Sequence, residues 1–311
     1  MTDYTIRTRD LTIDFESVRA VDHLTLDIPT GIVFGFLGPN GAGKTTTIRL
    51  LLGILEATEG EAEILGYDLR TQSAAIRERT GALLEYHGLY ERLSAEDNLE
   101  FFGRICRIPL NQRKERIKEL LNHLGLWERR KDRVKTWSRG MKQKLAVARA
   151  LFAHPSLVFL DEPTAGFDPE SAASLRQDLS ELVSRENLTV FLTTHNLVEA
   201  EKLCSLVGVI RKGKLVALGH PDELRSSVGV TQVKMIGGGF SDNLVSHLKS
   251  DPTVQSVIHQ DGRLELQLNP GARTAPLVRF LVEQGAEIEE VRKGISTLED
   301  AYMALMQEGE E

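Results

Sequence analysis

The sequence predicts an α/β protein with a mostly parallel sheet, followed by a smaller α+β domain. Strand and helix patterns alternate as far as residue 220, as they do in parallel sheets covered by helices. After His220-Pro221 the order changes to strand, helix, strand, strand, helix, strand, which is typical of a ferredoxin-like unit. We therefore expect one domain over residues 1–220 and a second over residues 221–311.

The charge is distributed unevenly between these two parts. The whole net charge of −7 falls within residues 221–311, which hold 8 Lys and Arg against 15 Asp and Glu. Residues 104–149, in contrast, hold 15 basic residues and only 4 acidic ones. Such a stretch is either a surface for nucleic-acid phosphates or the solvated face of helices. We favour the solvated face and expect no nucleic-acid partner.

Length and composition restrict the class of protein further. The chain has 311 residues, of which 41% are hydrophobic and 27% charged, as in a globular protein with a full core. It contains no apolar run near the ~20 residues of a membrane-spanning helix and no secretory signal pattern. We therefore expect a cytoplasmic protein. Cys106 and Cys204 lack metal-ligand spacing and are expected to be free thiols.

The elements of the first domain follow from the spacing of apolar residues. Alternation predicts strands over residues 4–13 and 21–28, and a run that is apolar on both faces predicts a buried strand over residues 31–37. Pro109 divides a helical stretch, which we expect to form an inserted helical subdomain over about residues 86–137. The other expected elements are helices over 46–55, 95–106, 112–124, 139–152, 170–185 and 197–203, strands over 157–161 and 189–193, and two short strands around Lys212-Gly213.

The second domain is expected to pair its strands through a hairpin. Asp261-Gly262 lies between two alternating runs and predicts a tight turn. A capping box over residues 296–299 predicts a final helix with Leu298, Ala301, Tyr302 and Leu305 on its apolar face. The remaining expected elements are strands over 231–236, 254–259, 263–268 and 287–292 and helices over 242–249 and 274–284.

Residues 38–45 fit a phosphate-binding motif. They read G-x-x-x-x-G-K-T and lie between the buried strand and a helix, the context that this motif requires. The glycines let backbone N–H groups converge on phosphate oxygens, the lysine reaches the β and γ phosphates, and the threonine hydroxyl ligates Mg²⁺. A glycine-rich turn that binds nothing is the alternative. We expect ATP and Mg²⁺ here, with contacts from Gly38, Pro39, Asn40, Gly41, Ala42, Gly43, Lys44, Thr45 and Thr46.

Two carboxylates follow the buried strand over residues 157–161. Buried acidic side chains repel each other unless a positive or protic partner is present. A metal ion and a water molecule are such partners, so we expect Asp161 to help hold Mg²⁺ and Glu162 to act as the general base. A helix cap is the alternative for Asp161.

Three further segments resemble those of ABC-type ATPases. Residues 137–144, Trp-Ser-Arg-Gly-Met-Lys-Gln-Lys, resemble the signature segment of the family. Residues 165–168 resemble its D-loop, and residues 193–195 resemble the segment with its switch histidine. With the two phosphate motifs, the resemblance covers residues 4–220. The acidic C-terminal part and residues 296–302 are similar to the type 2 branch, whose members export drugs, antibiotics, sodium, lipids or polysaccharides.

The resemblance implies a P-loop NTPase fold of the ABC nucleotide-binding type and a head-to-tail homodimer or pseudo-dimer. Each ATP would lie between the phosphate-binding loop of one cassette, residues 38–45 and here called the cradle, and the signature of the other, where Ser138 and Gly140 contact the γ-phosphate. His195 would contact the same phosphate from its own side as a catalytic residue, and Asp168 of the D-loop is counted among the nucleotide contacts. Phe15 would stack on adenine, with core packing as its alternative.

Two positions depart from the pattern of the family. Glu85 stands where the family has Gln, and we expect it to bind Mg²⁺ or to position water. Arg139 replaces the first glycine of the usual S-G-G. Its side chain is expected either to point away from the nucleotide or to add a positive charge beside the phosphates.

The resemblance also implies ATP hydrolysis that powers an exporter. The partners would be integral membrane permease subunits, with the chain peripheral on the inner face of the cell membrane. The C-terminal domain would serve dimer contact or regulation. A soluble ABC-type ATPase that acts on ribosomes or nucleic acid is one alternative, and a nucleotide-sensing module without hydrolysis is another.

Overall fold

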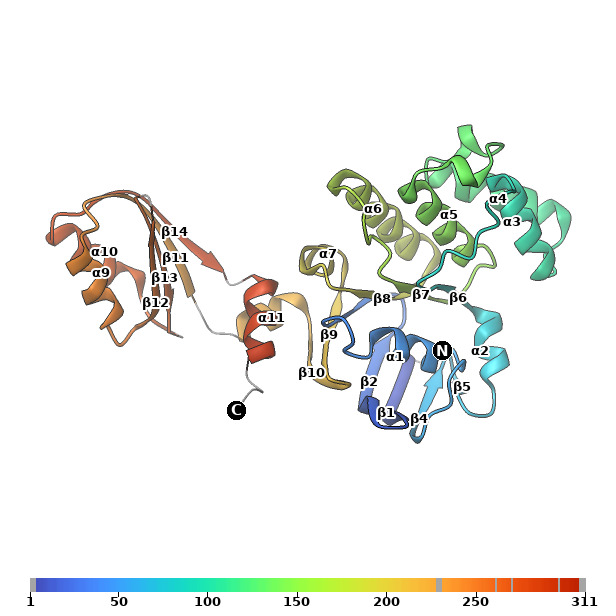
Figure 1. The fold of residues 1–311 in the computed structure, drawn as a ribbon, viewed down its shortest axis with the longest axis horizontal. Helices are drawn as coiled ribbons and strands as arrows, with labels where there is room; N and C mark the ends of the chain where they lie inside the picture. Colours follow the sequence, from blue (N-terminus) through green and yellow to red (C-terminus); the bar gives the residue numbers. More distant parts are fainter. Residues whose placement is uncertain (1–3, 228–230, 261, 270, 296, 308–311) are drawn as a thin grey trace. The chain divides into compact units, whose positions relative to one another are not determined.

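The computed structural model describes residues 4–227, 231–260, 262–269, 271–295 and 297–307. It divides into two compact units, Met1–His220 and Pro221–Glu311 (Figure 1). The α/β fold class predicted from the sequence is confirmed, because the first unit contains a sheet whose inner strands are all parallel. The turn residue Asp261 lies outside the described residues.

The first unit contains two sheets. The six-stranded sheet has the order β10-β9-β3-β8-β7-β6, and it is parallel except for the edge pair β9 and β10. The antiparallel sheet has the order β2-β1-β4-β5. The strands are β1 (Tyr4–Phe15), β2 (Val18–Pro29), β3 (Val33–Leu37), β4 (Glu59–Ile64), β5 (Tyr67–Asp68), β6 (Thr80–Leu83), β7 (Leu157–Asp161), β8 (Thr189–Thr194), β9 (Leu206–Arg211) and β10 (Lys214–Gly219).

Helices α5 (Arg139–Leu151) and α6 (Pro169–Glu186) lie on one side of the six-stranded sheet, whereas α1 (Lys44–Leu51) and the antiparallel sheet lie on the other (Figure 1). One buried apolar cluster joins the two sheets through α1, and its members include Ile6, Phe34, Ile48 and Phe159. The helices are α1 (Lys44–Leu51), α2 (Ser73–Arg79), α3 (Ala95–Ile105), α4 (Leu110–His123), α5 (Arg139–Leu151), α6 (Pro169–Glu186) and α7 (Leu197–Leu203), with short 3₁₀ turns at Trp127–Arg129 and Val134–Thr136. The buried cluster around Phe34 and Phe159 holds β3 and β7 in place, and the cradle and Asp161 lie at the ends of these two strands.

The second unit is a four-stranded antiparallel sheet with the order β12-β13-β11-β14. Its elements are α8 (Pro221–Ser227), β11 (Thr231–Gly238), α9 (Asp242–Lys249), β12 (Val254–Gln260), β13 (Arg263–Leu268), α10 (Thr274–Glu283), β14 (Glu287–Ile295) and α11 (Leu298–Gln307). Leu244 and Leu248 of α9 and Leu281 of α10 pack on one face of the sheet. This strand order confirms the predicted ferredoxin-like unit.

Several elements differ from the sequence prediction. β4, β5, α2, β6 and α8 were not expected, and each is seven residues long or shorter. The helix after the cradle ends at Leu51 rather than residue 55, because Gly53 turns the chain with a φ of 62°. The final capping box lies one residue later than predicted. The Thr297 hydroxyl accepts from the Asp300 N–H at 3.2 Å, and the Asp300 carboxylate accepts from the Thr297 N–H at 2.7 Å. Ser296 lies outside the described residues.

A buried arginine ties the helical subdomain to α6. Arg116 of α4 is 3% exposed and donates to Glu186 Oε1 at 3.0 Å, Glu186 Oε2 at 3.1 Å and the Leu151 carbonyl at 2.8 Å. Burial raises the pKa of Glu186, but hydrogen bonds from Arg116 and Arg185 outweigh it and hold that pKa below its ordinary value. Removing one partner of such a pair leaves a buried charge without compensation.

We expect Arg116→Met to lower the free energy of unfolding by about 3 kcal/mol. Arg185→Ala is the control, because Arg185 is half-exposed and its pairs are expected to contribute less than about 1 kcal/mol. Since the pKa of Glu186 is lowered by folding, the contribution of this pair is present at neutral pH and is lost as the pH falls through that lowered pKa. Urea unfolding measures the free energy of unfolding of the two variants. An equal decrease in both would contradict the assignment of Arg116 as the main partner of Glu186.

Candidate nucleotide site

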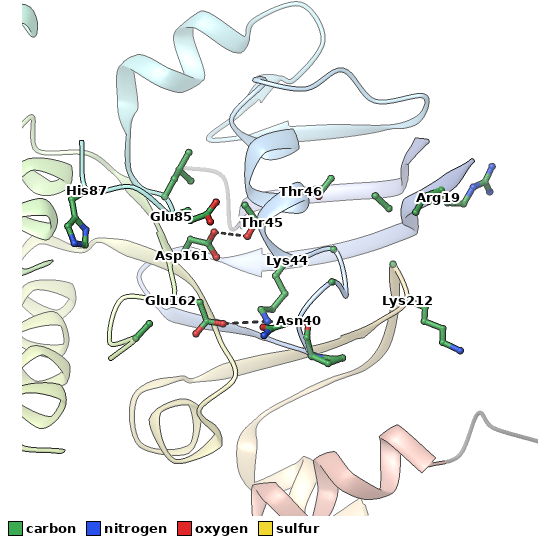
Figure 2. A pocket seen from close by; sticks show the side chains of 18 of the residues that line it. Arg19, Asn40, Lys44, Thr45, Thr46, Glu85, His87, Asp161, Glu162 and Lys212 are labelled. Carbon is green, nitrogen blue, oxygen red and sulfur yellow. Dashed lines mark hydrogen bonds and ion pairs between the residues drawn. The ribbon is translucent and has the colours of Figure 1, made fainter. Parts of the chain in front are cut away.

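A cavity of about 620 Å³ opens beside the cradle (Figure 2). Its volume is within the range of small-molecule sites. The cavity is lined by residues of the cradle, of β2, of the segments after β6 and β7, of α5 and of the turn between β9 and β10. From the cradle, the lining residues are Pro39, Asn40, Gly41, Gly43, Lys44, Thr45 and Thr46, whereas Gly38 and Ala42 belong to the same loop without lining it.

Residues 38–45 connect β3 to α1, and two glycines permit their close packing. A Cβ atom at Gly38 would lie 2.5 Å from the Ile210 carbonyl oxygen, and one at Gly43 would lie 2.4 Å from that of Ala20. Gly43 also has a φ of 108°, which side chains disfavour. The loop is therefore held between β2 and β9, and its N–H groups lead directly into the N-terminus of α1.

Lys44 lies at the centre of the cavity and is 7% exposed. Its ammonium donates to the Gly38 carbonyl at 2.6 Å and to the Pro39 carbonyl at 3.3 Å. It also lies 3.4 Å from Glu162 Oε1 (Figure 2). The buried ammonium thus has two carbonyl partners and one carboxylate partner. Phosphate oxygens can replace all three, because they form charge-assisted hydrogen bonds with an ammonium group.

Asp161 ends β7 and is 7% exposed. Its carboxylate accepts from the Thr45 hydroxyl at 2.7 Å and from the hydroxyl of Thr193 on β8. The helix after it, α6, is capped by Asp168, which accepts from the Ser171 N–H at 2.9 Å. The alternative of Asp161 as a helix cap is therefore wrong. Asp168 itself is not among the lining residues of this cavity.

Glu162 follows β7 with a φ of 50°, a left-handed conformation that is rare for a residue with a side chain. Its N–H donates to the Thr193 carbonyl at 3.1 Å, which holds this turn in place. Its carboxylate lies 2.8 Å from His195 Nδ1 as well as beside Lys44. The structure therefore brings Lys44, Glu162 and His195 together. Backbone strain of this kind concentrates at functional sites.

The signature residues lie at the start of α5. Ser138 is the N-cap of α5, and its hydroxyl accepts from the Met141 N–H at 3.2 Å. Arg139 and Gln143 line the cavity, whereas Ser138 and Gly140 do not. Arg139 therefore faces the cavity of its own chain, and its position relative to the phosphates stays a prediction.

Phe15 and Glu85 differ in their relation to the cavity. Phe15 ends β1, is 43% exposed and does not line the cavity, and the hairpin contributes Val18, Arg19 and Ala20 instead. Glu85 lines it and lies 3.9 Å from Arg49. The stacking of Phe15 on adenine stays a prediction.

His87, Gln143 and Lys212 also line the cavity, although the sequence does not predict a role for them there. Burial lowers the pKa of His87, and the positive charges of Arg139 and Lys142 lower it further. Both effects favour the neutral form of the imidazole. No local pattern marks these residues, because they come from three separate segments and meet only in the folded chain.

The donor atoms beside Thr45 suit a hard cation. Mg²⁺ prefers oxygen ligands and is commonly held by one or two carboxylates together with phosphates of the substrate. The Thr45 hydroxyl and the Asp161 carboxylate are such ligands. Among the described residues there is no cluster of three or more His, Cys, Asp or Glu that would hold a metal without a phosphate. In the same part of the chain, no helix is long and apolar enough to cross a membrane.

Comparisons with known proteins agree with this site. The sequence pattern of the ABC transporter family matches residues 21–165. The bacitracin transport ATP-binding protein BcrA of Bacillus licheniformis is 36% identical over 304 residues, which covers 97% of each chain. The daunorubicin/doxorubicin resistance ATP-binding protein DrrA of Streptomyces peucetius is 34% identical and covers 96% of this chain and 92% of its own.

Solved structures share the fold of the first unit. The ATP-binding subunit of an ABC transporter has a TM-score of 0.66 at 28% identity, over 72% of this chain and 93% of its own. A dimeric ATP-binding cassette, MJ0796, in a post-hydrolysis state with ADP and Pi, has a TM-score of 0.63 at 22% identity, over 69% of this chain and 98% of its own. The predicted family resemblance is thus confirmed. This chain belongs to the ATP-binding subunits of ABC transporters and is an ATPase.

Proposed function

We propose that this chain hydrolyses ATP to power a membrane exporter and that two copies close on two nucleotides. The observation that carries the proposal is the meeting of Lys44, Glu162 and His195 beside the cradle. The relatives named for bacitracin transport and for daunorubicin or doxorubicin resistance support an exporter of antibiotic-like compounds.

The cradle would bind the triphosphate, and Thr45 and Asp161 would hold Mg²⁺. Glu85, whose side chain lies beside Asp161 and Thr45 in Figure 2, would reach the same ion through its carboxylate. The ion would neutralise charge that develops on the phosphates. The Thr45 hydroxyl would exchange its hydrogen bond to Asp161 for an oxygen contact to the ion, since hydroxyl and carboxylate are both hard ligands.

Glu162 would accept a proton from a water molecule aimed at the γ-phosphorus. The bond from water oxygen to phosphorus forms as the bond to the β-phosphate oxygen breaks, and the products are ADP and inorganic phosphate. His195 would hold the Glu162 carboxylate in position through the 2.8 Å contact and would contact the γ-phosphate. Lys44 would leave its carbonyl partners for the β and γ oxygens.

The second copy would complete each site from its signature. Ser138 and Gly140 do not line the cavity of their own chain. This supports a role for them at the nucleotide of the partner. The N-terminus of α5 would then face the partner's γ-phosphate. Asp168 would contact the nucleotide at the same interface, and Phe15 would cover adenine after the β1–β2 hairpin closes on the base.

The helical subdomain would carry the motion to permease subunits in the membrane. Tyr86, which follows Glu85, is 82% exposed, and Tyr90 packs edge-on against Phe101 with ring centroids 4.9 Å apart. Exposed aromatic side chains of this kind are typical of protein interfaces. The chain would thus lie at the inner face of the membrane. The second unit would serve dimer contact or regulation.

Sedimentation with nucleotide tests the two-copy site. A chain with Glu162→Gln, which holds ATP unhydrolysed, should be a dimer with ATP and Mg²⁺ and a monomer with ADP. Adding Ser138→Arg should prevent dimer formation, because the long, charged arginine side chain cannot fit at the interface where serine would contact the γ-phosphate. Ser184→Arg adds the same charge to an exposed position on α6 outside the cavity and should leave the dimer intact. A monomer with ATP in the parent chain would contradict the proposal.

A further inference from the structure

We propose that Glu199 of α7 is a positioning residue for ATP hydrolysis. Its buried carboxyl group joins the hydroxyls of Thr164 and Thr194. These two threonines belong to the chain segments that carry Glu162 and His195. The inference rests on the roles of Glu162 and His195 in the proposed function, and it adds a residue that does not line the cavity.

Glu199 is a buried acid that the proposed reaction does not use. It is 0% exposed, and neither of its carboxylate oxygens has a well-aligned hydrogen bond to the described residues. Burial raises the pKa of this carboxyl group, whereas the hydroxyls of Thr194 and Thr164 lie beside it and lower that pKa in part. A buried carboxyl group destabilises the folded chain unless hydrogen bonds compensate its lost hydration. The two hydroxyls are therefore the partners that Glu199 requires.

The place of Glu199 in α7 directs its side chain back toward the end of β8. Asn196 is the N-cap of α7, and its side chain accepts from the Glu199 N–H at 3.2 Å. In a capping box, a glutamate at this third helical position accepts from the N–H of the N-cap residue. Here the Asn196 N–H donates to the Thr194 hydroxyl oxygen at 2.9 Å instead. The proton of that hydroxyl is then available to the Glu199 carboxylate.

Thr164 lies in the turn that holds Glu162. The Ala165 N–H donates to the Glu162 carbonyl at 3.1 Å, and the Phe167 N–H donates to the Thr164 carbonyl at 3.0 Å. Thr164 is buried, and its hydroxyl is the second one beside Glu199. A carboxylate can accept from two hydroxyls at once, because each of its oxygens has two lone pairs. Glu199 thus connects the turn of the general base to the end of β8.

This connection would fix the 2.8 Å contact between Glu162 and His195. Thr164 follows Glu162 closely in the chain, and Thr194 directly precedes His195. One carboxyl group bound to both threonines would keep the two segments at a constant separation. A general base depends on such precision, because a small displacement of a catalytic group lowers the rate strongly. Loss of the Glu199 carboxyl group should therefore slow the chemical step and leave nucleotide binding unchanged.

Steady-state hydrolysis of ATP with Mg²⁺ by the full chain tests the inference. Glu199→Ala should lower kcat about tenfold and change the KM for ATP less than twofold. Glu199→Gln should keep kcat within about threefold of the parent, because its amide can accept from one hydroxyl and donate to the other. Thr194→Val alone should lower kcat about threefold, and in the Glu199→Ala chain it should have no further effect, since the two side chains act as one unit.

Leu182→Ala is the control for a general loss of stability. Leu182 is buried near the end of α6, about 20 Å along the helix from its first residue. The substitution leaves a cavity, but kcat should stay within twofold of the parent. Circular dichroism shows whether each variant is folded. Parental kcat in a folded Glu199→Ala chain, an equal loss of kcat in Leu182→Ala, or losses from Glu199→Ala and Thr194→Val that multiply would each overturn the role of Glu199.

Glu162→Gln, measured alongside, separates this inference from the proposed function. If Glu162→Gln loses hydrolysis while Glu199→Ala retains it, the positioning role of Glu199 is wrong and the general base stands. If Glu162→Gln hydrolyses ATP at nearly the parent rate, the general base itself is wrong, and the positioning role is wrong with it.

Discussion

Replacing Lys44 with alanine is expected to weaken ATP binding by about a hundredfold and to abolish measurable hydrolysis. The ammonium lies at the centre of the cavity with carbonyl partners that it can exchange for phosphate oxygens. Hydrogen bonds to charged groups contribute about 1.5–3 kcal/mol each, so the loss of two of them corresponds to roughly a hundredfold or more in affinity. Calorimetric titration with ATP and Mg²⁺ measures the change.

Lys214→Ala is the matched control for Lys44→Ala. Lys214 lies on β10, is exposed, pairs with Asp22 at 3.3 Å and does not line the cavity. Its removal should change ATP affinity by less than twofold. Circular dichroism shows whether the Lys44 variant is folded, since the substitution empties a buried position beside Glu162. Undiminished ATP binding by a folded Lys44→Ala chain would contradict the cradle assignment.

Glu162→Gln is expected to lower the rate of ATP hydrolysis by about 10²–10⁴ while ATP still binds. Glutamine has the size of glutamate and lacks the basic carboxylate, so it cannot accept the proton of the attacking water. The positive φ of residue 162 is held by the N–H contact to Thr193, which glutamine retains. The ion pair with Lys44 is lost, and this cation becomes more available to phosphate.

Single-turnover measurements with saturating ATP separate binding from the chemical step for this variant. Glu181→Gln provides the control, because Glu181 lies exposed on α6, where its carboxylate accepts from the Gln177 amide at 3.0 Å. Its turnover should equal that of the parent chain. A Glu162→Gln chain that hydrolyses ATP within threefold of the parent rate would remove Glu162 from the role of general base.

The cradle and the two carboxylates could be predicted because their chemistry depends on neighbours in the sequence. Residues 38–45 need a strand before them and a helix after them, and both patterns are visible in apolar spacing. β7 has five residues, of which the first four are apolar and the last is Asp161. These signals are local, and the folded chain keeps them.

The remaining part of the site depends on contacts between distant segments. His87, Gln143 and Lys212 reach one cavity from separate parts of the chain, and nothing in their local sequence indicates this. β6 has only four residues, too few for a periodic pattern. The sequence cannot locate the final capping box to the residue, because Ser296 and Thr297 are both good N-caps and only the contacts of Asp300 distinguish them.

A crystal structure of the Glu162→Gln chain with ATP and Mg²⁺ tests the central claim most directly. We predict a triphosphate surrounded by the N–H groups of residues 38–45 and by Lys44, with Ser138 of a second copy within hydrogen-bond distance of the γ-phosphate. An ATP molecule bound elsewhere, with the loop after Gly38 free of phosphate, would contradict the account.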